Sequence, residues 1–329
     1  MPSLSHANEA AALAVAAFYR FVEIEEPSAL AAELLTLGRS RALRGTILIA
    51  HEGINGSIAG APGAVEDLLA RLRSRPAFAD LRAHLSRTTR NPFRRFKVKL
   101  RREIVSLGVA GITPGYRTGT RLDPAAWNDL LADPEVLVVD TRNDYEHRIG
   151  SFVGAVNPGT GHFREFPRFV AAELGTRRER PVAMFCTGGI RCEKASALLL
   201  AQGFASVYQL DGGILRYLSE TAPVASLWRG DCFVFDDRIA LDQRLTPADY
   251  LQCHGCRQPV SIAEREEPTF EPGVCCPACH DRLTPAQRAA FRERWRQQQL
   301  ATARGKQHVG AIMAEKPARV LRSAEVTLE

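Results

Sequence analysis

Apolar and polar residues alternate along the first hundred residues with a period of two in some segments and of about 3.6 in others. These patterns predict strands at residues 16–24, 45–50, 81–85 and 96–108, and helices at residues 27–37 and 63–73. The segment from His51 to Gly56 contains an Asn-Gly pair, which is typical of a hairpin turn, and it separates two β-rich segments. The resulting β-α-β-β-α-β order predicts a ferredoxin-like (acylphosphatase-like) α+β domain over residues 1–110.

A second α/β unit follows a linker at residues 111–123 that is rich in Gly, Thr and Pro. Short apolar segments predict buried parallel strands at residues 136–140, 182–185 and 207–210, and a helix is predicted at residues 193–202, before Gly203. Strands that alternate with helices predict a doubly wound parallel sheet over residues 123–225, in which ligands bind at the carboxyl ends of the strands.

Composition and charge narrow the class of protein. With 329 residues, of which 45% are hydrophobic, the chain is long enough for two or three domains. The net charge of +6 weakly favours a polyanionic partner. The apolar run at residues 10–18 is too short to span a membrane and lacks the basic start of a secretory signal, so we expect a cytoplasmic protein without a membrane partner. Nothing in the sequence indicates the oligomeric state.

The segment from Cys186 to Arg191 links a buried strand to a helix and has the composition of an anion-binding loop. Its intervening residues are Thr187, Gly188, Gly189 and Ile190. The two glycines let successive N–H groups turn inward, and a thiol beside them at a helix start has a pKa of roughly 3.5–7.5. We therefore predict that Cys186 is a catalytic nucleophile assisted by Arg191, rather than a buried structural cysteine. Cys192, at the helix start, either resolves an oxidised Cys186 or simply packs.

Several motifs together resemble the rhodanese domain over about residues 123–225. They are Cys186-x4-Arg191, Asp140-Thr-Arg142 with Glu146 and Gly150, Gly154-Ala-Val-Asn157, and Gly212-Gly213. The resemblance implies a loop that accommodates sulfur, since related phosphatase loops have one more residue between cysteine and arginine. It also implies that Asp140, Arg142 and Glu146 pair with one another to brace the loop.

Three further segments resemble the bacterial tRNA uridine hydroxylase family that has a central rhodanese domain. They are residues 186–194 (Cys-Thr-Gly-Gly-Ile-Arg-Cys-Glu-Lys), 52–56 (Glu-Gly-Ile-Asn-Gly) and 163–167 (Phe-Arg-Glu-Phe-Pro). This resemblance implies hydroxylation of the wobble uridine at its fifth carbon, with molecular oxygen as co-substrate and the anticodon region of tRNA as partner. A tRNA partner in turn favours RNA contact, over a merely solvated strand pair, for Arg90, Arg94, Arg95, Lys97 and Lys99.

The chemistry of the loop leaves two mechanisms open. Cys186 either adds to the sixth carbon of uracil, which makes the fifth carbon electron-rich, or it carries a persulfide. The sequence has no iron-binding facial triad, dinucleotide fingerprint or haem motif, so no organic cofactor is identified and the means of oxygen activation is unassigned. The alternative functions are a sulfurtransferase that acts through a Cys186 persulfide and an RNA-binding adaptor without catalysis.

Two Cys-x2-Cys pairs predict a structural zinc site in the C-terminal part of the chain. Cys253 and Cys256 are separated by 19 residues from Cys276 and Cys279, which is the paired spacing of a four-thiolate site. Cys275 is an alternative to Cys276. We expect a small zinc-binding segment at residues 226–300 and a disordered basic tail at residues 301–329.

Overall fold

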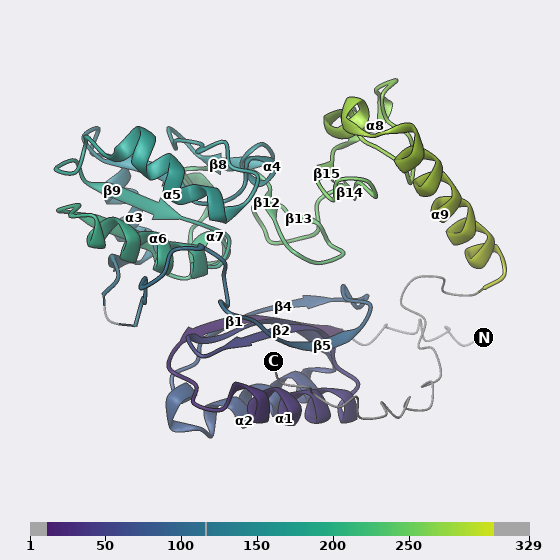
Figure 1. Ribbon diagram of the computed structural model, residues 1–329, viewed down its shortest axis with the longest axis horizontal. Coiled ribbons are helices and arrows are strands. Elements are labelled where there is room, and N and C mark those ends of the chain that lie inside the picture. The colour runs from purple at the N-terminus through teal and green to yellow at the C-terminus, as the bar shows by residue number, and fades with distance from the viewer. Residues whose placement is uncertain (1–11, 116, 306–329) are drawn as a thin grey trace, which may run out of the picture.

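The computed structural model describes residues 12–115 and 117–305, which form two α/β domains and a C-terminal arm (Figure 1). Helix α9 continues to Ala303, so the first three residues of the expected tail are helical. Residues 306–329 of that tail lie outside the described residues. No helix in the described ranges is long and apolar enough to cross a membrane.

The N-terminal domain is a five-stranded sheet with both long helices on one face (Figure 1). Its elements are β1 (Leu13–Phe21), α1 (Pro27–Ser40), β2 (Arg44–Ala50), β3 (Gly53–Gly60), α2 (Pro62–Arg73), β4 (Ala83–Thr88) and β5 (Phe96–Leu100). The order β4-β1-β3-β2 is that of a ferredoxin-like fold, and β5 extends it by pairing parallel to β2. The predicted α+β domain is confirmed, although its last predicted strand ends at Leu100 instead of residue 108.

The hairpin between β2 and β3 turns at His51 and Glu52, because Ala50 and Gly53 are register partners. The predicted use of the Asn-Gly pair as the turn was therefore wrong. Asn55 and Gly56 lie within β3, where a Cβ on Gly56 would come within 2.6 Å of the Phe18 ring. Glycine is needed there for close packing against an aromatic ring and not for a turn.

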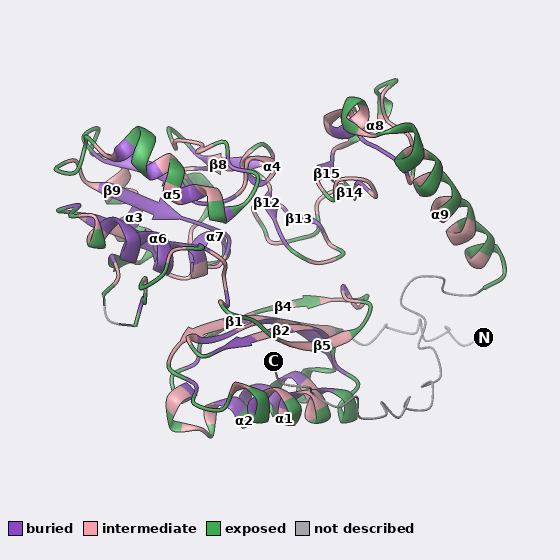
Figure 2. Ribbon diagram, viewed as in Figure 1, coloured by how far each residue is buried: buried purple, intermediate pink, exposed green. Residues whose placement is uncertain are grey.

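The central domain has a parallel sheet in the order β6-β10-β9-β7, which confirms the predicted doubly wound α/β fold. Its elements are β6 (Thr120–Leu122), α3 (Pro124–Leu131), β7 (Leu137–Asp140), α4 (Asp144–His147), β8 (Gly150–Phe152), α5 (Phe166–Phe169), a π-helical turn (Val170–Leu174), β9 (Val182–Phe185), α6 (Ile190–Ala201), β10 (Val207–Leu210) and α7 (Gly213–Glu220). Hydrophobic clusters cover both faces of the sheet, and β9 is buried along its whole length (Figure 2). Helix α6 begins three residues earlier than predicted, so Arg191 and Cys192 lie in its first turn.

The C-terminal arm has short strands. Its first part packs on the central domain through Trp228, Val234 and Leu241, whereas the part beyond residue 250 has little apolar core. The elements of the arm are β11 (Trp228–Gly230), β12 (Cys232–Phe233), β13 (Ala240–Leu241), β14 (Leu251–Gln252), β15 (Pro259–Val260), α8 (Ile262–Glu266), a 3-10 helix (Pro277–Arg282) and α9 (Pro285–Ala303). Strand β11 pairs with β8 of the central domain, whereas α9 has no buried residue (Figure 2). The cluster beneath α9 contains only two buried aliphatic residues, Val260 and Val274, and four buried cysteines. Apolar burial alone is therefore a weak source of stability for this part of the chain.

Candidate active site and metal centre

The Cys186 loop lies between the end of β9 and the start of α6, and the backbone holds its sulfur. Gly189 has φ +97° and donates its N–H to Cys186 Sγ at 3.1 Å. The start of α7 packs directly on the loop, because a Cβ on Gly213 would lie 2.4 Å from the Cys186 carbonyl oxygen. Ile214 N–H donates to the same carbonyl at 3.0 Å. The Gly212-Gly213 motif thus lets the start of α7 pack closely against the Cys186 carbonyl and hold the loop in place.

The remaining loop residues differ in their surroundings. Thr187 is buried and donates its hydroxyl to the Phe233 carbonyl at 3.4 Å. Gly188 has open space where a Cβ would be, so this residue leaves the loop uncovered on one side. Ile190 is the first residue of α6 and is half-buried.

Arg191 forms a buried, two-pronged ion pair with Glu146. Its two terminal nitrogens donate to the two carboxylate oxygens at 2.7 and 2.8 Å. Burial opposes the charged form, but Glu146 outweighs burial and raises the pKa of Arg191. The guanidinium therefore stays charged and is held in one orientation beside the loop.

A second buried pair lies behind the first. Arg142 is fully buried and donates to Asp140 through Nε at 2.9 Å and through a terminal nitrogen at 2.6 Å. It also donates to the Glu146 and Gly150 carbonyls. Burial opposes ionisation of Asp140, but Arg142 and the hydrogen bond from His147 hold its pKa at about 2. Asp140 and Arg142 pair with each other, but Glu146 differs from the pairing that the rhodanese resemblance implies, because its carboxylate pairs with Arg191 and only its backbone carbonyl accepts from Arg142.

The two thiols of the loop have opposite electrostatic surroundings. Burial opposes ionisation of Cys186, but a hydrogen bond from the Cys192 thiol, the Arg191 charge and the N–H groups of Arg191 and Cys192 lower its pKa to about 6. Burial and the neighbouring Cys186 raise the pKa of Cys192 well above its ordinary value. Cys186 is thus the thiolate at neutral pH, and Cys192 is a thiol that donates to it.

The reactivity of Cys186 is expected to depend on pH with a midpoint near 6. A thiol of lowered pKa is deprotonated above that value, so the rate of alkylation by iodoacetamide should rise through about pH 6 and then level off. Mass spectrometry of the peptides after timed labelling separates Cys186 from the other cysteines. A midpoint of about 8.5, the pKa of an ordinary cysteine, would contradict the lowered pKa of Cys186.

The N-terminal domain contacts helix α6, which follows the Cys186 loop. The residues that make this contact were given no role in the sequence analysis. Lys194 is buried and lies 2.8 Å from Glu52 and 2.5 Å from Glu103. Glu193 is buried as well and binds Arg121 at 2.8 Å. Glu52, Glu193 and Lys194 lie within the family motifs at residues 52–56 and 186–194, but a motif does not indicate which of its residues contact one another.

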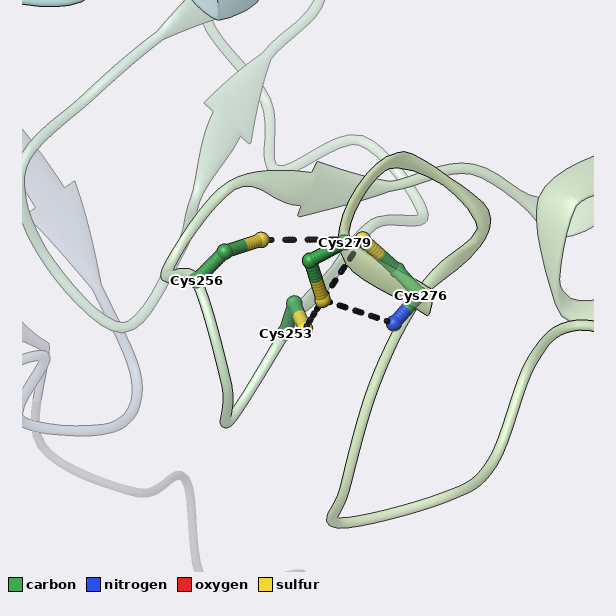
Figure 3. Close-up of side chains that lie close together, drawn as sticks. All are labelled: Cys253, Cys256, Cys276 and Cys279. Atoms are coloured by element: carbon green, nitrogen blue, oxygen red, sulfur yellow. Dashed lines mark hydrogen bonds between the residues drawn. The ribbon is translucent and has the colours of Figure 1, made fainter. Parts of the chain in front are cut away.

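Figure 3 shows the second cluster, in which four cysteine sulfurs lie within 4.8 Å of one another. The Sγ of Cys253 lies 3.7 Å from that of Cys279, and the Sγ of Cys256 lies 3.6 Å from that of Cys276. These distances fit the edge of a tetrahedron with Zn–S bonds of about 2.3 Å. Cys275 is outside the group and accepts a hydrogen bond from Arg288 at 3.3 Å. The four-cysteine cluster has the donor set to hold a metal.

The predicted RNA-binding residues lie on edge strand β5 of the N-terminal sheet and in the loop that precedes it. Lys97 and Lys99 lie on edge strand β5, on the opposite face from Phe96, which packs on the core that α1 covers. The arginines lie in the loop between β4 and β5 and are exposed at positions 90, 94 and 95. Arg94 is 3.5 Å from Asp237 of the C-terminal arm. The five residues are close in sequence, but β4 and β5 are opposite edges of the sheet, so the loop that carries Arg90 runs from one edge to the other.

Comparison with known proteins agrees with this division of the chain. Residues 13–104 match the family model of the UPF0176 acylphosphatase like domain, and residues 123–220 match that of the rhodanese-like domain. The protein is thus a rhodanese-domain protein with an acylphosphatase-like domain before it. It is 48% identical over 296 residues to the tRNA uridine(34) hydroxylase of Teredinibacter turnerae, covering 90% of this chain and 92% of that one. The chain therefore belongs to the tRNA uridine(34) hydroxylase family.

Solved structures cover less of the chain. A rhodanese-like domain from Anabaena sp. aligns with 34% of this chain and 80% of its own, at 20% identity and a TM-score of 0.28. The polysulfide-sulfur transferase of Wolinella succinogenes aligns with 31% of this chain and 74% of its own, at 25% identity and a TM-score of 0.27. At these TM-scores neither likeness adds to the family assignment.

Proposed function

We propose that this protein hydroxylates the wobble uridine of tRNA at its fifth carbon, with O2 as co-substrate and the Cys186 thiolate as reactive group. The observation that carries the proposal is the thiolate itself, lowered in pKa within a loop that Arg191 and the backbone N–H groups hold. The relative from Teredinibacter turnerae, named for uridine 34 of tRNA, supports the substrate.

The proposed role of Cys186 is covalent activation of the base. Its sulfur adds to the sixth carbon of uracil, and the electron pair of the ring double bond moves toward the fifth carbon, which then reacts with O2. Loss of the proton from the fifth carbon and departure of the Cys186 sulfur from the sixth restore the ring double bond. Cys186 itself is buried, so the base is proposed to approach past Gly188, where the structure leaves open space. The two glycines and Arg191 serve to keep the sulfur ionised until the base arrives.

Cys192 is proposed to supply, together with Cys186, the electrons that reduce the second oxygen atom of O2 to water. Uracil, O2 and two thiols give hydroxyuracil, water and one disulfide, so the Cys186 and Cys192 thiols together supply the two electrons that the second oxygen atom needs. The effect of Cys186 on the pKa of Cys192 supports the proximity of the two thiols. After one turnover without reductant, peptide mass spectrometry under non-reducing conditions is expected to find a Cys186–Cys192 disulfide. If both thiols stay free after turnover, the electrons come from elsewhere.

The remaining parts are assigned supporting roles. Zinc is proposed at Cys253, Cys256, Cys276 and Cys279, where four thiolates leave no open position for catalysis. The basic residues at positions 90, 94, 95, 97 and 99 are proposed to contact the phosphates of the anticodon region. A reducing cytoplasm suits both the thiol pair and the thiolate cluster.

The proposed function is tested by nucleoside mass spectrometry of tRNA from cells that lack this protein. Wild type should restore 5-hydroxylated uridine derivatives, whereas Cys186→Ala should not. The rhodanese-like match favours one rival, sulfur transfer from a Cys186 persulfide. Unchanged hydroxylation together with a fall in thiolated nucleosides would replace hydroxylation by sulfur transfer.

A further inference from the structure

Tyr19 of the N-terminal domain reaches across to the Cys186 loop. It lies on β1, where its neighbour Phe18 packs into the domain core, so Tyr19 points to the sheet face that carries no helix. Its hydroxyl donates to Glu193 Oε1 on α6 at 3.3 Å. The two residues are 174 positions apart in the chain, so this contact joins the two domains at the helix that begins in the loop.

The Tyr19 hydroxyl lies against the residue that holds the sulfur. A Cβ on Gly189 would be 2.8 Å from Tyr19 Oη, and Gly189 N–H is the donor to Cys186 Sγ. Burial, then Glu193 and the two loop thiols, raise the pKa of Tyr19 well above its ordinary value. Tyr19 therefore remains a neutral phenol at physiological pH, beside the residue whose N–H holds the Cys186 sulfur.

The acceptor of the Tyr19 hydroxyl is itself fixed. Glu193 binds Arg121 at 2.8 Å and accepts from Thr118 at 3.0 Å, both from the segment that leads into the central domain. The Lys194 ion pairs with Glu52 and Glu103 hold the same turn of α6 to the N-terminal domain. The Tyr19 side chain is thus held in one place, and the residue is half-buried.

We propose that Tyr19 is a positioning residue of the Cys186 site, so that the active centre is shared by the two domains. The inference rests on the proposed function. For sulfur to add to a uracil ring, the reacting atoms must approach to about 3–3.5 Å in a defined orientation. An aromatic ring beside the loop supplies a flat surface on which a base stacks, and Tyr19 is the aromatic residue that the N-terminal domain places against Gly189.

Three variants of the full-length protein test this role. Tyr19→Ala removes the ring, Tyr19→Phe keeps the ring without the bond to Glu193, and Arg20→Ala is the matched control. Arg20 is the next residue on the same strand, but its partner is Asp80 within the N-terminal domain, at 2.8 Å. We expect Tyr19→Ala to lower kcat/KM for tRNA hydroxylation at least tenfold, Tyr19→Phe to retain it within about threefold, and Arg20→Ala to match wild type. The Kd for tRNA should change less than twofold in all three.

Alkylation of Cys186 supplies a readout that does not depend on the substrate. Without the Tyr19 ring the loop is less covered, so the rate of alkylation above pH 7 should rise at least threefold in Tyr19→Ala and stay near wild type in Tyr19→Phe and Arg20→Ala. If Tyr19→Ala does not fold, Tyr19→Leu replaces it with the same expectations. Wild-type behaviour of the ring-less variant in either readout would overturn the inference.

Failure of this inference and failure of the proposed function give different results. If wild type itself does not form 5-hydroxyuridine in tRNA, the proposed function fails, whatever Tyr19 does. If Cys186→Ser is inactive while Tyr19→Ala hydroxylates like wild type, only the role of Tyr19 fails.

Discussion

Removal of the proposed zinc ion with a strong chelator is expected to unfold the part of the C-terminal arm around residues 251–282 and to leave the N-terminal and central domains folded. The only buried aliphatic residues of this cluster are Val260 and Val274, so the fold there depends on the four sulfurs. A structural zinc of this kind contributes about 10–16 kcal/mol of binding free energy that is lost on chelation. The N-terminal and central domains have separate hydrophobic clusters and should not respond.

Hydrogen exchange with and without chelator, together with metal analysis, measures this outcome. Cys253→Ser is expected to lose the metal and the exchange protection of the arm, whereas Cys275→Ser should keep about one equivalent of zinc. Cys275 is the matched control because it is adjacent in sequence to Cys276, buried, and outside the sulfur cluster. Unchanged exchange in the chelated protein would mean that the arm folds without metal.

Replacement of Glu146 by alanine is expected to cost about 3–5 kcal/mol of unfolding free energy and to reduce hydroxylation at least a hundredfold. Glu146 is fully buried and is the carboxylate that neutralises Arg191, so its loss leaves a buried, unpaired cation beside the catalytic loop. Urea unfolding measures the stability and tRNA hydroxylation the activity.

Two further variants serve as controls for Glu146→Ala: one breaks a surface ion pair, and the other removes both charges of the buried pair. Glu220→Ala removes a pair with Arg216 in which the Glu220 side chain is 48% exposed, and it should cost less than about 1 kcal/mol. The double variant Glu146→Leu with Arg191→Met should recover much of the stability but no activity, because it removes the buried charges together. A single Glu146→Ala variant as stable as wild type would contradict the bracing role.

The sequence predicted those parts of the fold that depend on local patterns. Strand β9 begins and ends where its apolar residues do, since a strand buried on both faces needs an unbroken apolar run. The Asn-Gly pair gave a wrong turn prediction, because glycine occurs both in turns and where a backbone packs closely against another group. At Gly56 it is the close packing against Phe18 that requires glycine. Helix α6 starts early because the αL conformation of Gly189 lets the helix begin directly after the loop.

The sequence predicted the parts of the candidate site that depend on the spacing of residues in the chain. It did not predict the parts that depend on contacts between domains. The Cys-x2-Cys pairs brought four sulfurs together as expected, and the S–S distances favour Cys276 over Cys275. The partners of Lys194 were not predictable, because Glu52 and Glu103 lie on another domain. Local periodicity carries no information about which surfaces of two domains meet.

The most direct test of Cys186 as the reactive group compares purified wild type and Cys186→Ser on the same tRNA. The rate of 5-hydroxyuridine formation and the Kd for tRNA are measured on the same preparations, both with their zinc content verified. We predict that the serine variant loses at least a thousandfold in rate while its Kd stays within twofold, since serine is about the same size but is not ionised at neutral pH. A serine variant that hydroxylates tRNA at the wild-type rate would contradict the central role of the thiolate.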